Sequence, residues 1–215
     1  MKILNCYYVQ LHKIILFSVL SLIFSAGKVS SQTAEEFFEM GFDSYFDRNF
    51  EDAISYFSRA IQIKPDYTEA YLYRGEARSD YGRYSDALAD FDKVIKLDSV
   101  NFDAYFQKCI TEYRMGNYEE ALRDCDRSIL MRPPYDMAYY FRAKIKRELQ
   151  DYEGAISDCN EAIGLMPAFF PYYSERGIYK ILAGKKEEGC KDLKKALEMG
   201  EDPNSIKQIM DAHCK

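Results

Sequence analysis

The sequence is poor in the residues that catalysis and metal binding use most often. It has no tryptophan and only two histidines, His12 and His213, and its six cysteines form no CxxC motif or Cys/His cluster. A Ser/His/Asp or Cys/His catalytic group would have to rely on His213, and a zinc site lacks its ligands. No glycine-rich loop follows a strand pattern, so no phosphate cradle is predicted. We therefore expect no catalytic site, no metal and no cofactor.

Positive charge is scarce relative to negative charge. Lysine and arginine number 29 against 35 aspartate and glutamate residues, which gives a formal net charge of -6. Nucleic-acid binding needs clustered basic side chains that neutralise phosphates, and no basic stripe in the sequence escapes pairing with acids. The composition thus argues against a nucleic-acid partner.

Long hydrophobic runs are also missing. The longest is "IILFSVLSLIF", residues 14–24, which is too short for a helix that spans a bilayer. It follows a weakly basic start and precedes the small and polar "SAGKVSSQ", the order of a secretory signal peptide. We expect residues 1–31 to be this signal, cleaved after Gly27 or Ser31, and the protein to be periplasmic or extracellular. The alternative is an uncleaved anchor, which would be the only contact with a membrane.

The sequence does contain an internal repeat. A shift of 34 residues aligns the chain with itself without gaps. Position 20 is alanine in four units and glycine in the fifth, position 28 is always isoleucine or leucine, and position 32 is proline in three units. The units are 34–67, 68–101, 102–135, 136–169 and 170–203.

A 34-residue unit with glycine or alanine at position 8, alanine at 20 and 27, and proline at 32 resembles the tetratricopeptide repeat. The resemblance covers nearly all of residues 34–203 and implies an all-α, right-handed α-solenoid of paired antiparallel helices. Each pair buries its apolar face only by stacking on its neighbours, so the array needs a solvated end. Residues 204–215, with Ile206, Ile209 and Met210 at one-turn spacing, are predicted to form a C-terminal capping helix.

Two positions of the repeat, 7 and 23, carry charged residues that change together from one unit to the next. Where position 7 is basic, position 23 is aspartate, and where position 7 is methionine (Met40), position 23 is tyrosine (Tyr56). In an antiparallel hairpin bent near position 15, positions 7 and 23 lie side by side. We expect structural ion pairs within the units, rather than a basic ladder for an anionic ligand: Arg74–Asp90, Lys108–Asp124, Arg142–Asp158 and Arg176–Asp192.

Five cysteines follow the predicted signal, so at least one thiol stays free. Cys190 and Cys214 are each twelve residues from Asp202, where the chain is expected to turn between two antiparallel helices. A disulfide between them would pin the end of the solenoid. Cys109, Cys125 and Cys159 fall in core columns and read as small buried hydrophobes, with a Cys109–Cys125 bridge as the less favoured alternative.

The resemblance implies that the first helix of each unit lines a concave groove, chiefly through positions 2, 5, 9, 12 and 13. The family's carboxylate-clamping members carry lysine at position 5 and asparagine at 9 of the first repeat, where this chain has Phe38 and Phe42, so that activity does not carry over. The residues expected to bind a partner in the groove are Phe38, Phe42, Tyr45, Phe106, Ile110, Tyr113, Tyr140, Lys144 and Arg147. In the first repeat, Phe38, Phe42 and Tyr45 have an equally good alternative role, which is to cover the end of the stack.

These observations predict a non-catalytic scaffold that binds another protein or a peptide with apolar anchors and an acidic residue. A periplasmic carrier or chaperone-like binder of apolar segments is the alternative. A cryptic hydrolase or enzyme accessory is a third hypothesis, and its catalytic version depends on His213.

Overall fold

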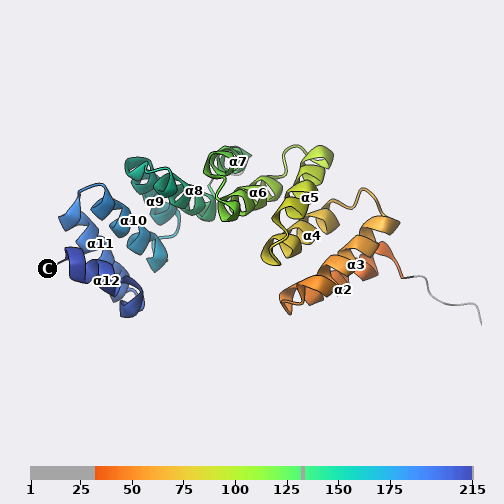
Figure 1. The fold of residues 1–215 in the computed structure, drawn as a ribbon, viewed down its shortest axis with the longest axis horizontal. Helices are drawn as coiled ribbons and strands as arrows, with labels where there is room; N and C mark the ends of the chain where they lie inside the picture. The colour runs from red at the N-terminus through yellow and green to blue at the C-terminus, as the bar shows by residue number, and fades with distance from the viewer. Residues whose placement is uncertain (1–31, 132–133, 215) are drawn as a thin grey trace, which may run out of the picture.

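The computed structural model describes residues 32–131 and 134–214. Within them the chain forms five antiparallel helix pairs and one further helix, stacked in an arc with α2 and α3 at one end and α12 at the other (Figure 1). The fold is the all-α, right-handed solenoid expected from the sequence. The pairs are α2 (Ala34–Phe46) with α3 (Phe50–Ile63), α4 (Thr68–Asp80) with α5 (Tyr84–Leu97), α6 (Phe102–Met115) with α7 (Tyr118–Met131), α8 (Asp136–Glu148) with α9 (Tyr152–Leu165), and α10 (Phe170–Leu182) with α11 (Lys186–Glu198). The last helix is α12 (Pro203–His213).

The small columns of the repeat are where helices approach most closely. The alanine at position 20 is fully buried in the first four units. At position 8, a Cβ atom on Gly75 would lie 2.5 Å from the ring carbon Cε1 of Phe91, on the second helix of the same unit. Glycine therefore allows the large aromatic at position 24 to fill the space between the two helices.

The turn inside each unit has one repeated backbone feature. Position 15 has a left-handed conformation in every unit, and three units place glycine there: Gly82, Gly116 and Gly184. The other two place Arg48 and Gln150 there, with φ of 60° and 61°. A side chain in this conformation costs free energy that glycine avoids, so these two turns carry backbone strain.

Arg74 connects three helices. Its Nε and Nη2 donate to the two carboxylate oxygens of Asp90 on α5, at 2.9 and 2.7 Å, and its Nη1 donates to Ser58 Oγ on α3 at 3.0 Å. Arg78, one turn further along α4, donates to the same carboxylate at 2.6 Å. This clip joins the two helices of a unit and ties them to the unit before.

Two later units repeat the arrangement. Arg142 and Arg176 hold Asp158 and Asp192 with two hydrogen bonds each, and they reach back to position 25 of the preceding unit. A lysine takes the place of Arg78 in both units. The residues at position 25 are Asp126 and Asn160.

The third unit departs from the predicted pairing. Lys108 Nζ lies 2.7 Å from Asp92 on the preceding unit but 3.8 Å from Asp124, its expected partner. Lysine offers a compact ammonium without the fork that lets arginine hold two carboxylates at once. Position 11 of this unit is Glu112 instead of a cation, and burial together with the charge of Glu112 raises the pKa of Asp124. The main partner of Lys108 is therefore Asp92.

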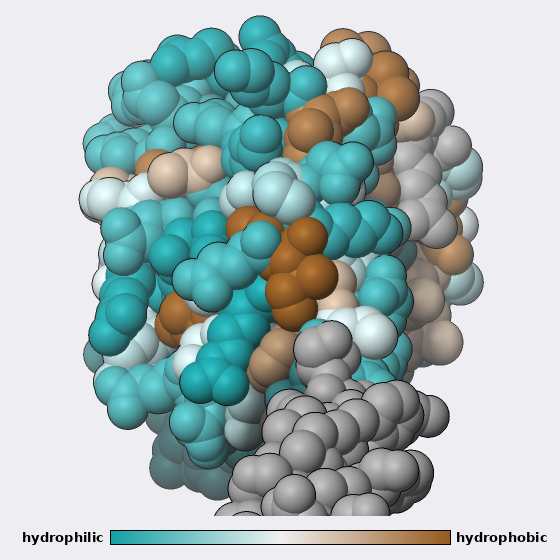
Figure 2. Space-filling view, turned by 90° about the vertical axis from the view of Figure 1, so that its right-hand side faces the viewer, coloured by the Kyte–Doolittle hydropathy of each residue, from teal (hydrophilic) through white to brown (hydrophobic). Residues whose placement is uncertain are grey.

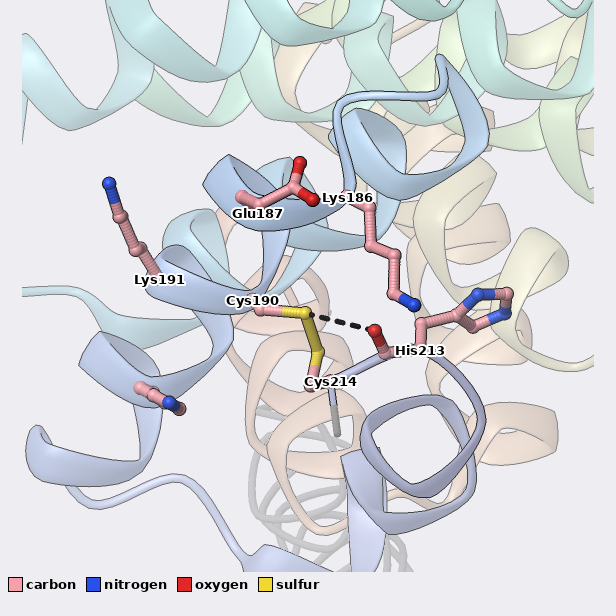
Figure 3. A pocket seen from close by; sticks show the side chains of 7 residues that line it. Lys186, Glu187, Cys190, Lys191, His213 and Cys214 are labelled. Carbon is pink, nitrogen blue, oxygen red and sulfur yellow. Dashed lines mark hydrogen bonds between the residues drawn. A yellow bond between two sulfur atoms is a disulfide. The ribbon is translucent and has the colours of Figure 1, made fainter.

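The capping helix α12 packs on α10 and α11. A disulfide joins Cys190 on α11 to Cys214, with 5.5 Å between their Cα atoms, and Figure 3 shows it between α11 and the end of α12. Cys109, Cys125 and Cys159 are free and buried. A cavity beside the disulfide is lined by three lysines, Lys186, Lys191 and Lys194, and by His213. Figure 3 shows that Lys191 points away from Lys186 and His213.

The other end of the stack is the α2–α3 end. Figure 2 faces this end and shows a mostly hydrophilic surface with separate apolar patches. The predicted signal peptide, residues 1–31, lies outside the described residues. No helix among the described residues is both long and apolar enough to cross a bilayer.

Candidate peptide-binding groove

The inner layer of the arc consists of the first helices of the pairs. Neighbouring first helices contact one another, α2 with α4, α4 with α6 and α6 with α8, in addition to their contacts with second helices. Because neighbouring first helices lie close enough to contact one another, their layer is the inner side of the arc. This layer therefore lies on the concave side. We call its exposed side the groove.

The N-terminal part of the groove is aromatic. Phe38 packs against Phe57 and Tyr67, with ring centroids 5.6 and 5.1 Å apart, and Phe42 packs against Tyr73 at 5.1 Å. Phe57 and Tyr67 belong to the first unit, whereas Tyr73 belongs to the second and also lies 5.8 Å from Phe38, so Phe38 and Phe42 pack at the boundary between the first two units. Phe46, which was not among the predicted groove residues, is the exposed member of the cluster, with 66% of its surface accessible. Phe46 occupies position 13 of its unit, one of the positions that line the groove in this family. That position could have predicted its exposure in the groove.

Beside this cluster lies a polar network. Tyr45 donates its hydroxyl to Asp80 at 3.0 Å and lies 3.4 Å from Glu76, while Arg114 Nη1 donates to Asp80 at 2.7 Å. The pKa of Glu76 is raised to about 7, mainly by burial and to a smaller extent by the charge of Asp80, while the hydrogen bond from Tyr45 opposes the shift. Tyr45 is thus tied to the second unit by hydrogen bonds, and the network joins three units along the groove.

The central part of the groove brings together four predicted residues from two neighbouring helices. Tyr113 lies on α6, whereas Tyr140, Lys144 and Arg147 lie on α8. Lys144 Nζ is 5.8 Å from the ring centre of Tyr113, 5.5 Å from that of Tyr140 and 5.8 Å from that of Phe141. An ammonium group at these distances is attracted by the rings, so the lysine is held in place while it is only half-buried.

Arg147 is less free than its position suggested. It is paired with Glu148 on its own helix, and its positive charge lies close enough to Tyr113 to lower the pKa of that phenol against the larger effect of burial. The negative charge of Glu148 therefore offsets part of the basic character predicted for this spot.

Phe106 does not line the groove. Only 6% of its surface is accessible, and its ring packs edge-on against Tyr135 and Phe141 at 5.2 and 5.6 Å. It belongs to the core between the third and fourth units, and its assignment as a contact residue is corrected. Ile110, one turn further along α6, is half-buried and packs against the same core.

The fold and the groove define a class, the helical-repeat proteins whose pairs of helices stack into a solenoid. The family model described as "Tetratricopeptide repeat" matches residues 43–102 and 110–172, more than half of the chain, and the chain belongs to this family.

Solved structures with this fold include MamA, at 23% identity and a TM-score of 0.70, covering 80% of this chain and 94% of MamA. TTC0263 of Thermus thermophilus is 17% identical, with a TM-score of 0.65 and coverage of 85% and 99%. YrrB, described as a repeat protein with an unusual peptide-binding site, is 15% identical, with a TM-score of 0.66 and coverage of 83% and 92%. No protein with a curated description matches the chain.

Proposed function

We propose that the protein is a non-catalytic scaffold that binds a peptide segment of another protein in the groove. The observation that carries this proposal is the central cluster of Tyr113, Tyr140 and Lys144 on neighbouring inner helices. Half-buried tyrosines offer large rigid surfaces at a low entropy cost, which makes them good anchors at interfaces. Proteins of this family act as interaction modules, and YrrB carries a peptide-binding site on the same fold.

The chemistry of the cluster suits a segment with apolar side chains and an acidic residue. Apolar side chains would pack on the rings of Tyr113 and Tyr140, and a carboxylate would pair with the ammonium of Lys144. The ring contacts fix the position of the ammonium before a partner arrives, so little side-chain freedom is lost on binding.

We also propose that the protein acts outside the cytoplasm. The order of residues 1–31 supports export, and so does the disulfide between Cys190 and Cys214, because disulfides persist mainly in oxidising compartments. Fractionation of cells and a peptide map of the N-terminus would test both parts. A cytoplasmic protein with reduced Cys190 and Cys214 would contradict them.

The groove is tested by comparing partner capture between two triple variants. Tyr113, Tyr140 and Arg147 are replaced by alanine in the first, and the exposed second-helix residues Asp86, Lys96 and Glu161 in the second. Crosslinking and pull-down should lose the partner with the first variant and keep it with the second, at equal helical content. Retention by the groove variant would move the site to the convex face or to the cap.

The carrier hypothesis has one observation in its favour, the exposed ring of Phe46 beside Phe42. A carrier of apolar segments would bind many unrelated unfolded chains, and Phe46→Ser would weaken that binding. If the protein captures one partner and Phe46→Ser does not change this capture, the result supports the scaffold.

A further inference from the structure

A cavity lies at the C-terminal end of the groove, where the capping helix meets the last repeat. Its volume is about 280 Å³, and α8, α10 and α12 all contribute to its lining. The apolar wall is formed by Tyr140, Phe170, Ile178 and Ile206. Because Tyr140 also belongs to the central cluster, this cap cavity is continuous with the groove.

Two carboxylates face this apolar wall. Glu175 comes from α10, and Glu201 from the loop that leads into α12. Ser174 Oγ donates to one oxygen of Glu201 at 2.9 Å and Ser205 Oγ to the other at 2.5 Å, so the carboxylate is fixed in position. Among residues 32–131 and 134–214, no lysine or arginine forms a salt bridge with either acid. The cavity therefore holds two carboxylates that form no salt bridge among the described residues, and the charge of Glu175 also acts on Arg147, where it helps to raise the pKa of the guanidinium.

We propose that the cap cavity takes a basic side chain, arginine or lysine, of the peptide that binds in the groove; this inference rests on the proposed function and names part of its specificity. The aliphatic stem of such a residue packs on Ile178 and Ile206, and its charged head reaches the carboxylates. An acidic side chain would meet two like charges, and an apolar one would bury carboxylates without pairing them.

Lys144 does not compete for the cavity. Its ammonium is held among Tyr113, Tyr140 and Phe141, and it is not among the residues that line the cavity. The groove thus presents a cation at its centre and two carboxylates at its end. A segment that satisfies both has an acidic residue at the centre of the groove and a basic residue toward the cap.

The test uses two capped peptides that differ only in charge, Ac-Ala-Ala-Arg-Ala-Ala-NH2 and the same peptide with citrulline at the central position. Each is titrated into the ¹⁵N-labelled full chain, and amide shifts are followed by NMR. The arginine peptide should shift amides around Ser174 and Ile206 and bind at least about tenfold more tightly than the citrulline peptide. Glu201→Gln should remove most of this difference, and Glu175→Gln should reduce it.

Glu187→Gln is the matched control, because it removes an acid from α11 outside the cap cavity and should leave binding unchanged. If Glu201→Gln weakens the packing of α12, the Glu175→Gln variant alone is used to judge whether binding of the arginine peptide depends on the carboxylates. Equal binding of the two peptides, or arginine-dependent shifts confined to other helices, would overturn the inference. The proposed function would survive that result, because partner capture by the groove is measured separately.

Discussion

At the scale of single residues, the arginine at position 7 explains how the repeats stay in register. Arg74 binds Asp90 of its own unit and Ser58 of the unit before, and both contacts span sixteen residues of sequence. Asp90 is almost fully buried, so it is stable as a charged group only because cations surround it. The clip is a structural device and is not available to a ligand.

Replacing Arg74 should expose this dependence. Arg74→Met leaves Asp90 with one cation and should lower the free energy of unfolding by several kcal/mol, roughly 3 if the site does not relax. Arg74→Met with Asp90→Tyr should recover part of the loss, although Arg78 then lacks its partner.

Adding Arg78→Ser completes the set of residues that the first unit uses, which are Met40, Ser44 and Tyr56. This triple variant should recover the most stability in urea unfolding. If the triple variant is no more stable than Arg74→Met, an ion pair between the helices is not the reason why positions 7 and 23 change together.

Glu76 should make the stability depend on pH. Its ordinary pKa is 4.5, and burial raises it to about 7 in the folded protein. The folded state thus binds the proton more tightly than the unfolded state, and the stability this contributes is full below pH 4.5 and is lost as the pH rises to about 7. Glu76→Gln should remove the loss and stabilise the protein at pH 8 by roughly 2–3 kcal/mol.

The measurement is urea unfolding at pH 5 and pH 8 for the wild type and for Glu76→Gln. Glu69→Gln, at an exposed position on the same helix, is the control and should not alter the difference between the two pH values. A Glu76→Gln effect that is the same at both pH values would contradict the buried environment of this carboxyl.

The contacts that sequence could predict at this scale were those that repeat. Arg74 and Asp90 change together with their equivalents, and the hairpin geometry places them opposite each other. Contacts to the preceding unit were missed, because position 25 varies among serine, aspartate, asparagine and lysine and looks like an ordinary solvated position. The burial of Phe106 was also missed, since it depends on the ring of Tyr135 at the end of its own unit and on that of Phe141 in the next unit.

At the scale of elements, the residue in the left-handed conformation at position 15 of each turn should have a measurable effect on stability. No atom lies within 4 Å of a Cβ added to Gly116, so Gly116→Ala tests the backbone alone and should lower stability by about 1 kcal/mol. Gln150→Gly at the equivalent place should raise it by about 0.5–1 kcal/mol. Thermal unfolding of the two variants should therefore shift in opposite directions. Shifts in the same direction would mean that side-chain contacts dominate these turns.

The disulfide between Cys190 and Cys214 should hold the capping helix. It closes a loop of 24 residues, so its removal should cost roughly 3 kcal/mol by the chain-entropy estimate. Cys190→Ser with Cys214→Ser should speed hydrogen exchange in 203–213 and leave exchange in α2–α5 unchanged, because repeats interact only with their neighbours. If hydrogen exchange in α12 is the same with and without the disulfide, the packing of Ile206 is sufficient to hold the capping helix in place.

At the scale of the whole molecule, the repeat made the fold predictable. All five units share the small and apolar positions, and three of them end with the same proline, so each unit is predicted to form one helix pair. Stacking follows because a single pair cannot bury its apolar face. The cap cavity was not predictable in the same way. It forms where Glu201 replaces the usual proline and α12 replaces a sixth repeat, so it has no column in the sequence.

The most direct test of the central claim is photo-crosslinking from defined positions on the two faces. A photoreactive residue replaces Tyr113 in the groove or Glu161 on the exposed side of α9, and crosslinked partners are identified by mass spectrometry. We expect crosslinks to one peptide segment from Tyr113 and none to that segment from Glu161. Crosslinks to that segment from Glu161 alone would contradict a groove-binding scaffold.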